Sequence, residues 1–162
     1  KNCKLVSAMN GLEALDILRV EKGHVTGREI DGRVTLGDLG MPGMASRAKE
    51  HVGRALMERE GLVDPARPSL VGLRPVEAGA KVSGGALLHP LGEETGRGVG
   101  HVSSVADSPM LGMRVALGFV SGGLARWQGR MLMAKDPISG RDVKLRVGPP
   151  CFVDPQGERL HG

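Results

Sequence analysis

Six short apolar runs, separated by turns rich in glycine or proline, fill the chain after residue 68 and constrain its fold more than any other feature. They cover residues 70–73, 86–89, 99–105, 114–120, 131–134 and 143–147. Each run is rich in branched residues and shorter than a typical helix, a pattern that favours β-strands. In the last run, Val143, Leu145 and Val147 alternate with Lys144 and Arg146, which is the period of a half-buried strand. Strands at this spacing predict a closed or nearly closed antiparallel barrel.

A proline-rich boundary precedes the barrel segment. Pro65 and Pro68 stand close together, and proline disfavours both helix interiors and central strands. Residues 136–140, between the last two runs, have the composition of a hairpin loop. We therefore predict an α+β chain in two parts: a short α/β segment over residues 1–66 and a barrel over residues 67–162.

Residues 11–23 carry a helix pattern with both ends marked. Asn10 and Glu13 have the spacing of a capping box, and Gly23 supplies a left-handed cap after the last turn. Glu21 lies in that last turn, where charged side chains are usually hydrated. Three leucines recur at helical spacing and are expected to face a core: Leu12, Leu15 and Leu18.

The rest of the first part is less regular. We expect residues 25–31 to be extended and residues 36–44 to be irregular, because the second stretch is rich in glycine and proline. Residues 46–60 fit one helix, although Gly53 weakens its middle by about 1 kcal/mol. Its apolar face would hold Ala48, Val52, Ala55 and Leu56.

Composition narrows the classes of function. The chain has no Tyr, and its rings are limited to Trp127, Phe119 and Phe152, which disfavours a nucleic-acid binder that stacks bases on aromatic side chains. Its formal charge is +4, but Lys and Arg are interspersed with acids along the sequence, which indicates a solvated surface.

Neither a membrane segment nor a secretory leader is expected. No run approaches the ~20 apolar residues of a membrane helix, and the first residues lack the pattern of a secretory signal. Cys3 and Cys151 stand near opposite ends, so free thiols of a cytoplasmic protein are the first expectation and a terminal disulfide is the alternative.

Three familiar kinds of site find little support. The glycines of residues 96–100 lack the spacing of a phosphate loop and run into a strand, so they predict a turn. His101, Ser103, Ser104 and Asp107 contain the residue types of a hydrolase triad but lie too close along one strand to form one. Isolated histidines predict no metal site: His24, His51, His89, His101 and His161.

Several motifs resemble the folate-dependent T-protein (aminomethyltransferase) family of the glycine cleavage system. Residues 11–23 are similar to its G-L-x-A-x-D-x-L-R-x-E-x-G segment, and residues 100–120 are similar to its G-x-V-T-S-x-x-x-S-P-x-L and A-L-G-Y-V elements. Residues 19–25 and the tail over 153–162 resemble the alpha subunits of heterotetrameric sarcosine oxidases most closely. Residues 50–54 resemble a family segment that is extended and leads into a helix near Arg54, the alternative to one helix over 46–60.

The resemblance implies a fold and a binding role. It implies the C-terminal part of a folate-binding aminomethyltransferase-like domain over residues 1–66 and a six-stranded, Greek-key-like barrel after it. In the related enzymes the glutamate that matches Glu21 holds the amino-pyrimidine edge of folate, because a carboxylate accepts two hydrogen bonds from adjacent N–H donors. Arg19 would brace a carboxylate or the helix end. His24 would line the same cavity or lie in an exposed loop, and Arg47 and Lys49 fall near a basic folate contact without a preserved pattern.

The implied function is folate binding within a larger oxidase. The assembly would oxidise a methylated glycine at a flavin and transfer the one-carbon unit to tetrahydrofolate, with flavin and NAD held only in parts outside this chain. Expected partners are the other subunits or the family's N-terminal part, with self-association as a further expectation.

Departures from the family keep two alternatives open. The family's aspartate near the reacting folate nitrogen lies outside the match, and its C-terminal tyrosine has no counterpart here, so we expect no turnover by this chain alone. One alternative is a structural or docking barrel that does not bind folate. A nucleic-acid-binding barrel is the other, because a small barrel alone does not decide function.

Overall fold

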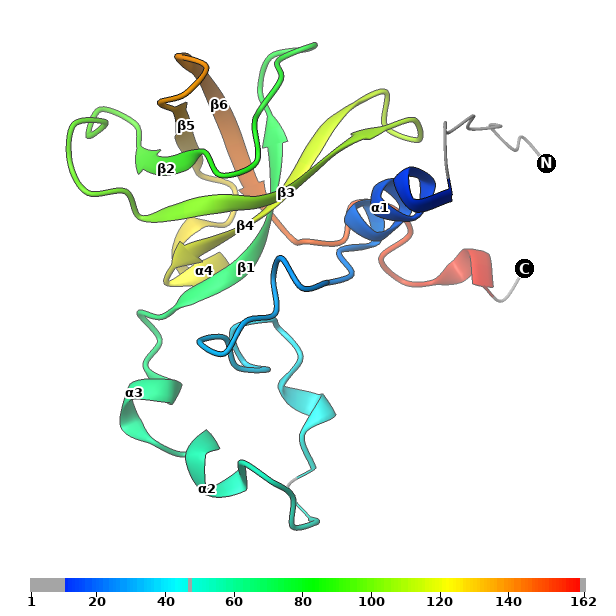
Figure 1. Cartoon of the computed structure of the whole chain (residues 1–162), viewed down its shortest axis with the longest axis vertical. Helices are drawn as coiled ribbons and strands as arrows, with labels where there is room; N and C mark the ends of the chain where they lie inside the picture. Colours follow the sequence, from blue (N-terminus) through cyan, green and yellow to red (C-terminus); the bar gives the residue numbers. More distant parts are fainter. Residues whose placement is uncertain (1–10, 47, 161–162) are drawn as a thin grey trace.

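The computed structural model describes residues 11–46 and 48–160 (Figure 1). Its helices are α1 (Gly11–Lys22), α2 (Arg54–Met57), α3 (Glu60–Val63) and α4 (Gly123–Trp127), with 3-10 turns at Pro42–Met44 and Glu158–Leu160. Its strands are β1 (Pro68–Pro75), β2 (Leu87–Pro90), β3 (Gly100–Ser108), β4 (Met113–Ser121), β5 (Met131–Asp136) and β6 (Arg141–Gly148). None of the helices in this part of the chain is long and apolar enough to cross a membrane.

The six strands form a closed antiparallel barrel, as the sequence predicts. Their order is β1-β4-β3-β2-β5-β6, and β1 pairs with β6 to close it. Strands β2, β3 and β4 are consecutive neighbours and β1 returns beside β4, which is a Greek-key arrangement. Each of the six apolar runs contributes one strand, and the turn over 136–140 joins β5 to β6.

One hydrophobic core fills the barrel. The predicted alternation in β6 is confirmed, because Val143, Leu145 and Val147 are buried while Lys144 and Arg146 are exposed. The inward-facing side chains of the six strands meet in one cluster, in which Trp127 of α4 also packs. Its largest fully buried members are Leu73, Leu88, Leu132, Leu145, Val71, Val82, Val102 and Val120.

A second core lies on the outer face of β1, β4 and β3. Val20 of α1 and Leu39 of the following loop pack there against Leu117, Phe119 and other strand residues, with Phe152 of the tail beside them. The tail can approach because β1 carries a glycine at position 72, where a Cβ would lie 2.2 Å from the backbone oxygen of Pro149. Segments on both sides of residue 67 therefore share this core.

The predicted face of α1 is wrong, although the helix and the residue at which it ends are confirmed. Leu12, Leu15 and Leu18 are 80%, 63% and 56% exposed. The buried face instead holds Val20 and Glu21, which pack toward β3 and β4. A short helix with apolar residues on two faces does not reveal by periodicity which face is covered. Gly23 adopts a φ of +72° as a helix-ending glycine should, and Asn10 lies outside the described residues.

Two other expectations for the first part need correction. Residues 25–31 are not extended, because a turn spans Thr26 to Glu29, whose N–H donates to the Thr26 carbonyl. Residues 46–60 do not form one helix: Gly53 adopts a φ of +92°, which helices exclude, and Val52 is fully exposed. The alternative start at Arg54 is confirmed, but a turn precedes it instead of an extended element.

Candidate functional site

Glu21 is a buried carboxylate, not a solvated last-turn acid. Its residue is 3% exposed, and the Ser108 hydroxyl donates to its Oε1 at 2.5 Å. The Leu111 N–H donates to the same Ser108 oxygen at 3.1 Å, which leaves the single hydroxyl hydrogen for Glu21. Among the described residues, Ser108 is the one donor to this carboxylate. Its orientation is therefore set by the end of β3 and the turn that follows.

The chain after β6 fixes the end of the helix that carries Glu21. The Glu21 carbonyl accepts hydrogen bonds from the N–H groups of Phe152 (2.8 Å) and Val153 (3.0 Å). Lys22 donates to the Asp154 carbonyl at 2.6 Å and to its carboxylate at 3.2 Å. The first two bonds satisfy one helix-end carbonyl, and all four hold the last turn of α1 against the tail that follows β6 (Figure 1).

A second buried carboxylate, Glu29, lies where α1 meets β3. Ser104 and Ser103 donate to its Oε1 at 2.5 and 2.8 Å. The Thr26 N–H (3.0 Å) and Arg19 (3.2 Å) donate to its Oε2. Burial raises the pKa of Glu29, but these hydrogen bonds and the Arg19 charge outweigh it and hold the pKa below its usual value of 4.5. The interpretation of Arg19 as a brace for a carboxylate is confirmed.

Sequence reasoning missed Glu29. A signal was available, because Thr26 and Glu29 have the T-x-x-E spacing in which the two ends of a turn bond each other. The polar residues of β3 that have the residue types of a catalytic triad contact other residues instead of one another. Asp107 pairs with Arg114 at 2.6 Å, and the His101 ring stacks on Phe119 with centroids 5.9 Å apart.

A third buried carboxylate, Asp38, ties the first part of the chain to β1. Arg67 donates to it at 2.6 Å and the Thr35 N–H donates at 2.9 Å, while the Asp38 carbonyl accepts the N–H of Leu70 at 2.7 Å. Burial raises the pKa of Asp38, and the hydrogen bonds with Arg67 and Thr35 outweigh it, so the pKa lies below its usual value of 3.8. The same Arg67 also donates to the Arg33 carbonyl at 2.8 Å.

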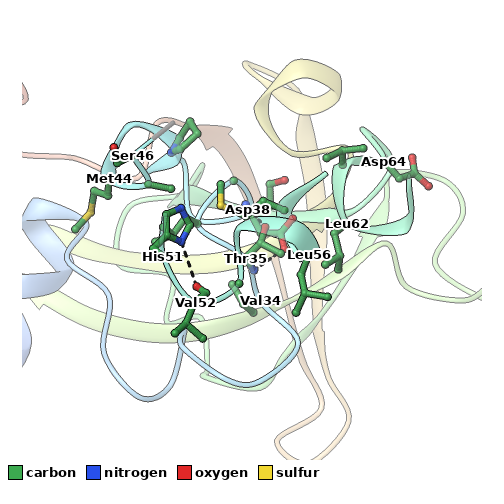
Figure 2. Close-up of a pocket in the computed structure, with 18 of the residues that line it drawn as sticks. Val34, Thr35, Asp38, Met44, Ser46, His51, Val52, Leu56, Leu62 and Asp64 are labelled. Carbon is green, nitrogen blue, oxygen red and sulfur yellow. Dashed lines mark hydrogen bonds between the residues drawn. The ribbon is translucent and has the colours of Figure 1, made fainter. Parts of the chain in front are cut away.

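A cavity of about 960 Å³ lies between the segments over residues 34–46 and 49–65, the second of which includes α2 and α3 (Figure 2). Its walls are mostly apolar, with Asp38, Lys49 and His51 among its polar residues. The ring of His51 lies 3.1 Å from the Val52 carbonyl through Nδ1, while its buried Nε2 has no partner in the described part of the chain. The volume falls within the range of small-molecule sites.

The structure does not bring all the candidate residues together. Lys49 lines the large cavity, whereas neither Glu21 nor His24 does, and His24 is exposed. Arg47 lies outside the described residues. A second, more open hollow of about 700 Å³ lies along α1, between Leu12, Leu15 and the Thr26 turn.

Within the described residues, no three His, Cys, Asp or Glu side chains are grouped as metal ligands would be. Cys151 is half-buried and free, with its thiol 3.4 Å from the Val153 carbonyl. Cys3 and His161 lie outside the described residues.

Acid should weaken the fold through Glu29 and Asp38. Each folded-state pKa lies below its usual value, 4.5 or 3.8, so each carboxylate contributes stability above that value and loses it as the pH falls through the folded pKa. We expect the free energy of unfolding, measured in urea, to begin to fall below about pH 5 and to continue to fall below pH 3.8, until both carboxylates are protonated in the folded state. The paired substitution E29Q/D38N should flatten this dependence, and an unchanged slope would contradict the assignment.

Comparisons with known proteins agree on one family. A family model described as the glycine cleavage T-protein C-terminal barrel domain matches residues 69–154. The chain is 39% identical over 154 residues to a sarcosine oxidase subunit alpha from Rhizobium meliloti, covering 93% of this chain and 16% of the relative. It is 34% identical over 157 residues to the subunit of the same name from Corynebacterium sp. strain U-96, covering 94% of this chain and 16% of that relative.

A solved structure shares the fold. The glycine cleavage system aminomethyltransferase T from Bartonella henselae superposes with a TM-score of 0.67 at 24% identity, over 89% of this chain and 39% of that one. The chain thus spans about 16% of the length of its curated relatives.

Proposed function

The chain belongs to the glycine cleavage T-protein C-terminal barrel family, and from that premise we propose that it is the folate-binding portion of a sarcosine oxidase alpha-type subunit. The names of the relatives over 93% and 94% of the chain support this choice within the family. The proposal includes the division into residues 1–66 and 67–162, which the start of the family match at residue 69 supports. We also propose a cytoplasmic location. The one argument for it is that the two cysteines are expected to be free thiols.

The observation that carries the proposal is the buried carboxylate of Glu21. A carboxylate held by one hydroxyl retains acceptor capacity for a further donor, and the amino-pyrimidine edge of a pterin presents N–H groups suited to it. Desolvation strengthens such a charge-assisted hydrogen bond. Glu21 is the one acceptor for folate that we propose in this chain. It lines neither of the two cavities described above. The rest of a folate pocket would come from partner chains or from another part of the polypeptide.

The proposed role is positioning. Holding the folate amine beside a reactive one-carbon unit would turn an encounter between two molecules into a local reaction. Flavin and NAD would be bound elsewhere in the assembly, and this chain by itself would not turn over substrate. The partners would be the other oxidase subunits.

Calorimetric titration of 5-formyltetrahydrofolate into the folded chain, with and without candidate partner chains, tests this function. Saturable binding in either setting, at one site per chain, is the expected result. Absence of binding in both settings, with folding confirmed by circular dichroism, would overturn the proposal.

A second function, docking without folate, is favoured by a specific surface. The exposed leucines of α1, Leu12, Leu15 and Leu18, form one apolar stripe. Contiguous exposed apolar surface of this kind usually marks an interaction site. We propose that the stripe packs against a partner chain or a second copy of this chain.

Replacing the stripe should abolish association. In light scattering over a concentration series, we expect the wild-type chain to show a mass above that of a monomer and L12S/L15S/L18S to remain monomeric, because serine removes the apolar area that drives contact. The matched control V52S/I138S changes two fully exposed apolar residues elsewhere and should associate as the wild type does. A monomeric wild-type chain that also binds no partner subunit would contradict the docking role.

A further inference from the structure

The outer face of the barrel differs between its two sides. On β4, β3 and the start of β1, at Leu70, that face is covered by α1, the loop around Leu39 and the tail, which pack there in the second core. On β5 and β6 the outward side chains include exposed Met131, Lys144 and Arg146. This exposed face of β1, β6 and β5, defined by Arg74, Lys144, Arg146, Met131 and Met133, is called here the basic stripe.

Strand register places these side chains in two rows. Arg74 of β1 stands opposite Arg146 of β6, and Arg146 stands opposite Met131 of β5. In the next row, Lys144 stands opposite Met133. Residues directly opposite in an antiparallel pair point to the same face, so three cations and two methionines lie together. The even distribution of charge expected from the sequence does not extend to this face.

The cations of the stripe have no acidic partner among the described residues. Arg74 makes only a 3.5 Å hydrogen bond to the Phe152 carbonyl and stacks over its ring, 5.2 Å from the centroid. In the adjacent row, by contrast, the positive charge is neutralised, because Lys135 forms an ion pair with Asp142 at 3.8 Å. Like charges directly opposite each other destabilise a sheet. The pairing of Arg74 with Arg146 is therefore unfavourable, and among the described residues only the contacts of Arg74 with Phe152 offset it.

The cations and methionines of the basic stripe indicate which kind of partner it would bind. Arginine and methionine are enriched in protein–protein interfaces, and unpaired cations complement carboxylates. A nucleic acid is a poorer match, because the chain's three aromatic residues are only 5–7% exposed and offer no stacking surface. We propose that the basic stripe docks an acidic, partly apolar surface of a partner protein.

Charge reversal tests the docking with a defined probe. Fluorescence anisotropy would measure the affinity of a fluorescein-labelled 16-residue peptide of Glu-Leu-Glu-Gly repeats for the full chain. We expect K144E/R146E to weaken binding by at least about tenfold. The substitutions replace two cations with carboxylates, which would repel the glutamates of the peptide. The control R59E/R97E reverses two exposed cations outside the stripe. Both variants take the formal charge from +4 to 0, so they do not differ in net charge.

The control should change affinity by less than about twofold, and the wild-type affinity should fall as salt rises. Equal losses in both variants would show that net charge alone attracts the peptide and would overturn the proposal. Tighter binding of a 16-nucleotide oligo(dT) than of the peptide would also overturn it, in favour of a nucleic-acid surface. R146E places a carboxylate opposite Arg74 and should not lower the melting temperature, and a lower value would contradict the argument from like charges.

Discussion

Glu21→Gln is expected to lower folate affinity by well over tenfold while leaving the fold intact. Glutamine nearly preserves the shape of the side chain but replaces one acceptor oxygen with a donor, which would face the N–H donors of the pterin edge. Losing one charged partner of a desolvated hydrogen bond typically costs about 2–5 kcal/mol. The remaining oxygen can still accept from Ser108, so we expect the free energy of unfolding to change by less than about 1 kcal/mol.

The measurement is a calorimetric titration of 5-formyltetrahydrofolate alongside a melting curve for each variant. Glu13→Gln removes a carboxylate from an exposed position on the same helix and serves as the control, with unchanged affinity expected. If Glu21→Gln binds folate as tightly as the wild type, Glu21 is a structural residue that fastens α1 to β3.

Glu29→Ala is expected to cause the largest loss of stability, about 2–3 kcal/mol. The substitution removes the acceptor for Arg19, whose side chain is 11% exposed, and for the fully buried hydroxyl of Ser104. Arg19 keeps its ion pair with Asp16 at 2.6 Å, so the main penalty comes from the Ser104 hydroxyl, which loses the acceptor of its hydrogen bond inside the protein. Urea unfolding monitored by circular dichroism measures the effect.

An exposed ion pair supplies the control for Glu29. Asp31→Asn breaks the contact of Asp31 with Arg33, which lies in solvent, and should leave the free energy of unfolding nearly unchanged. Similar small losses in both variants would contradict the importance of the buried network around Glu29.

Much of the fold could be predicted from the sequence because local rules govern it. Strand β6 shows why, since Val143, Leu145 and Val147 face the core and their polar neighbours face water. The end of α1 was equally predictable, because Gly23 takes the left-handed conformation that other residues avoid. These features depend on side chains a few residues apart.

The parts that escaped prediction depend on distant contacts. Ser104 lies 75 residues from Glu29, and Arg67 lies 29 residues from Asp38. No period within α1 reveals that Val20 and Glu21 would be covered by β3 and β4 while the leucines remained exposed. Arg74 and Arg146 likewise meet only when β1 closes the barrel against β6. The resemblance to T-proteins singled out Glu21, but its burial and its bond to Ser108 required the fold.

The contact of Glu21 with the pterin can be tested by changing both the side chain and the group that it is proposed to hold. The ligands are 5-formyltetrahydrofolate and its 2-desamino-2-methyl analogue, in which a methyl group replaces the 2-amino group of the pterin. Titration would use wild type and Glu21→Gln in whichever state, alone or with partner chains, binds folate. We predict that the analogue binds the wild type more than about tenfold more weakly than the parent compound does. In Glu21→Gln this difference should shrink to less than about threefold. If the analogue loses the same factor in affinity in both proteins, Glu21 does not contact the pterin edge.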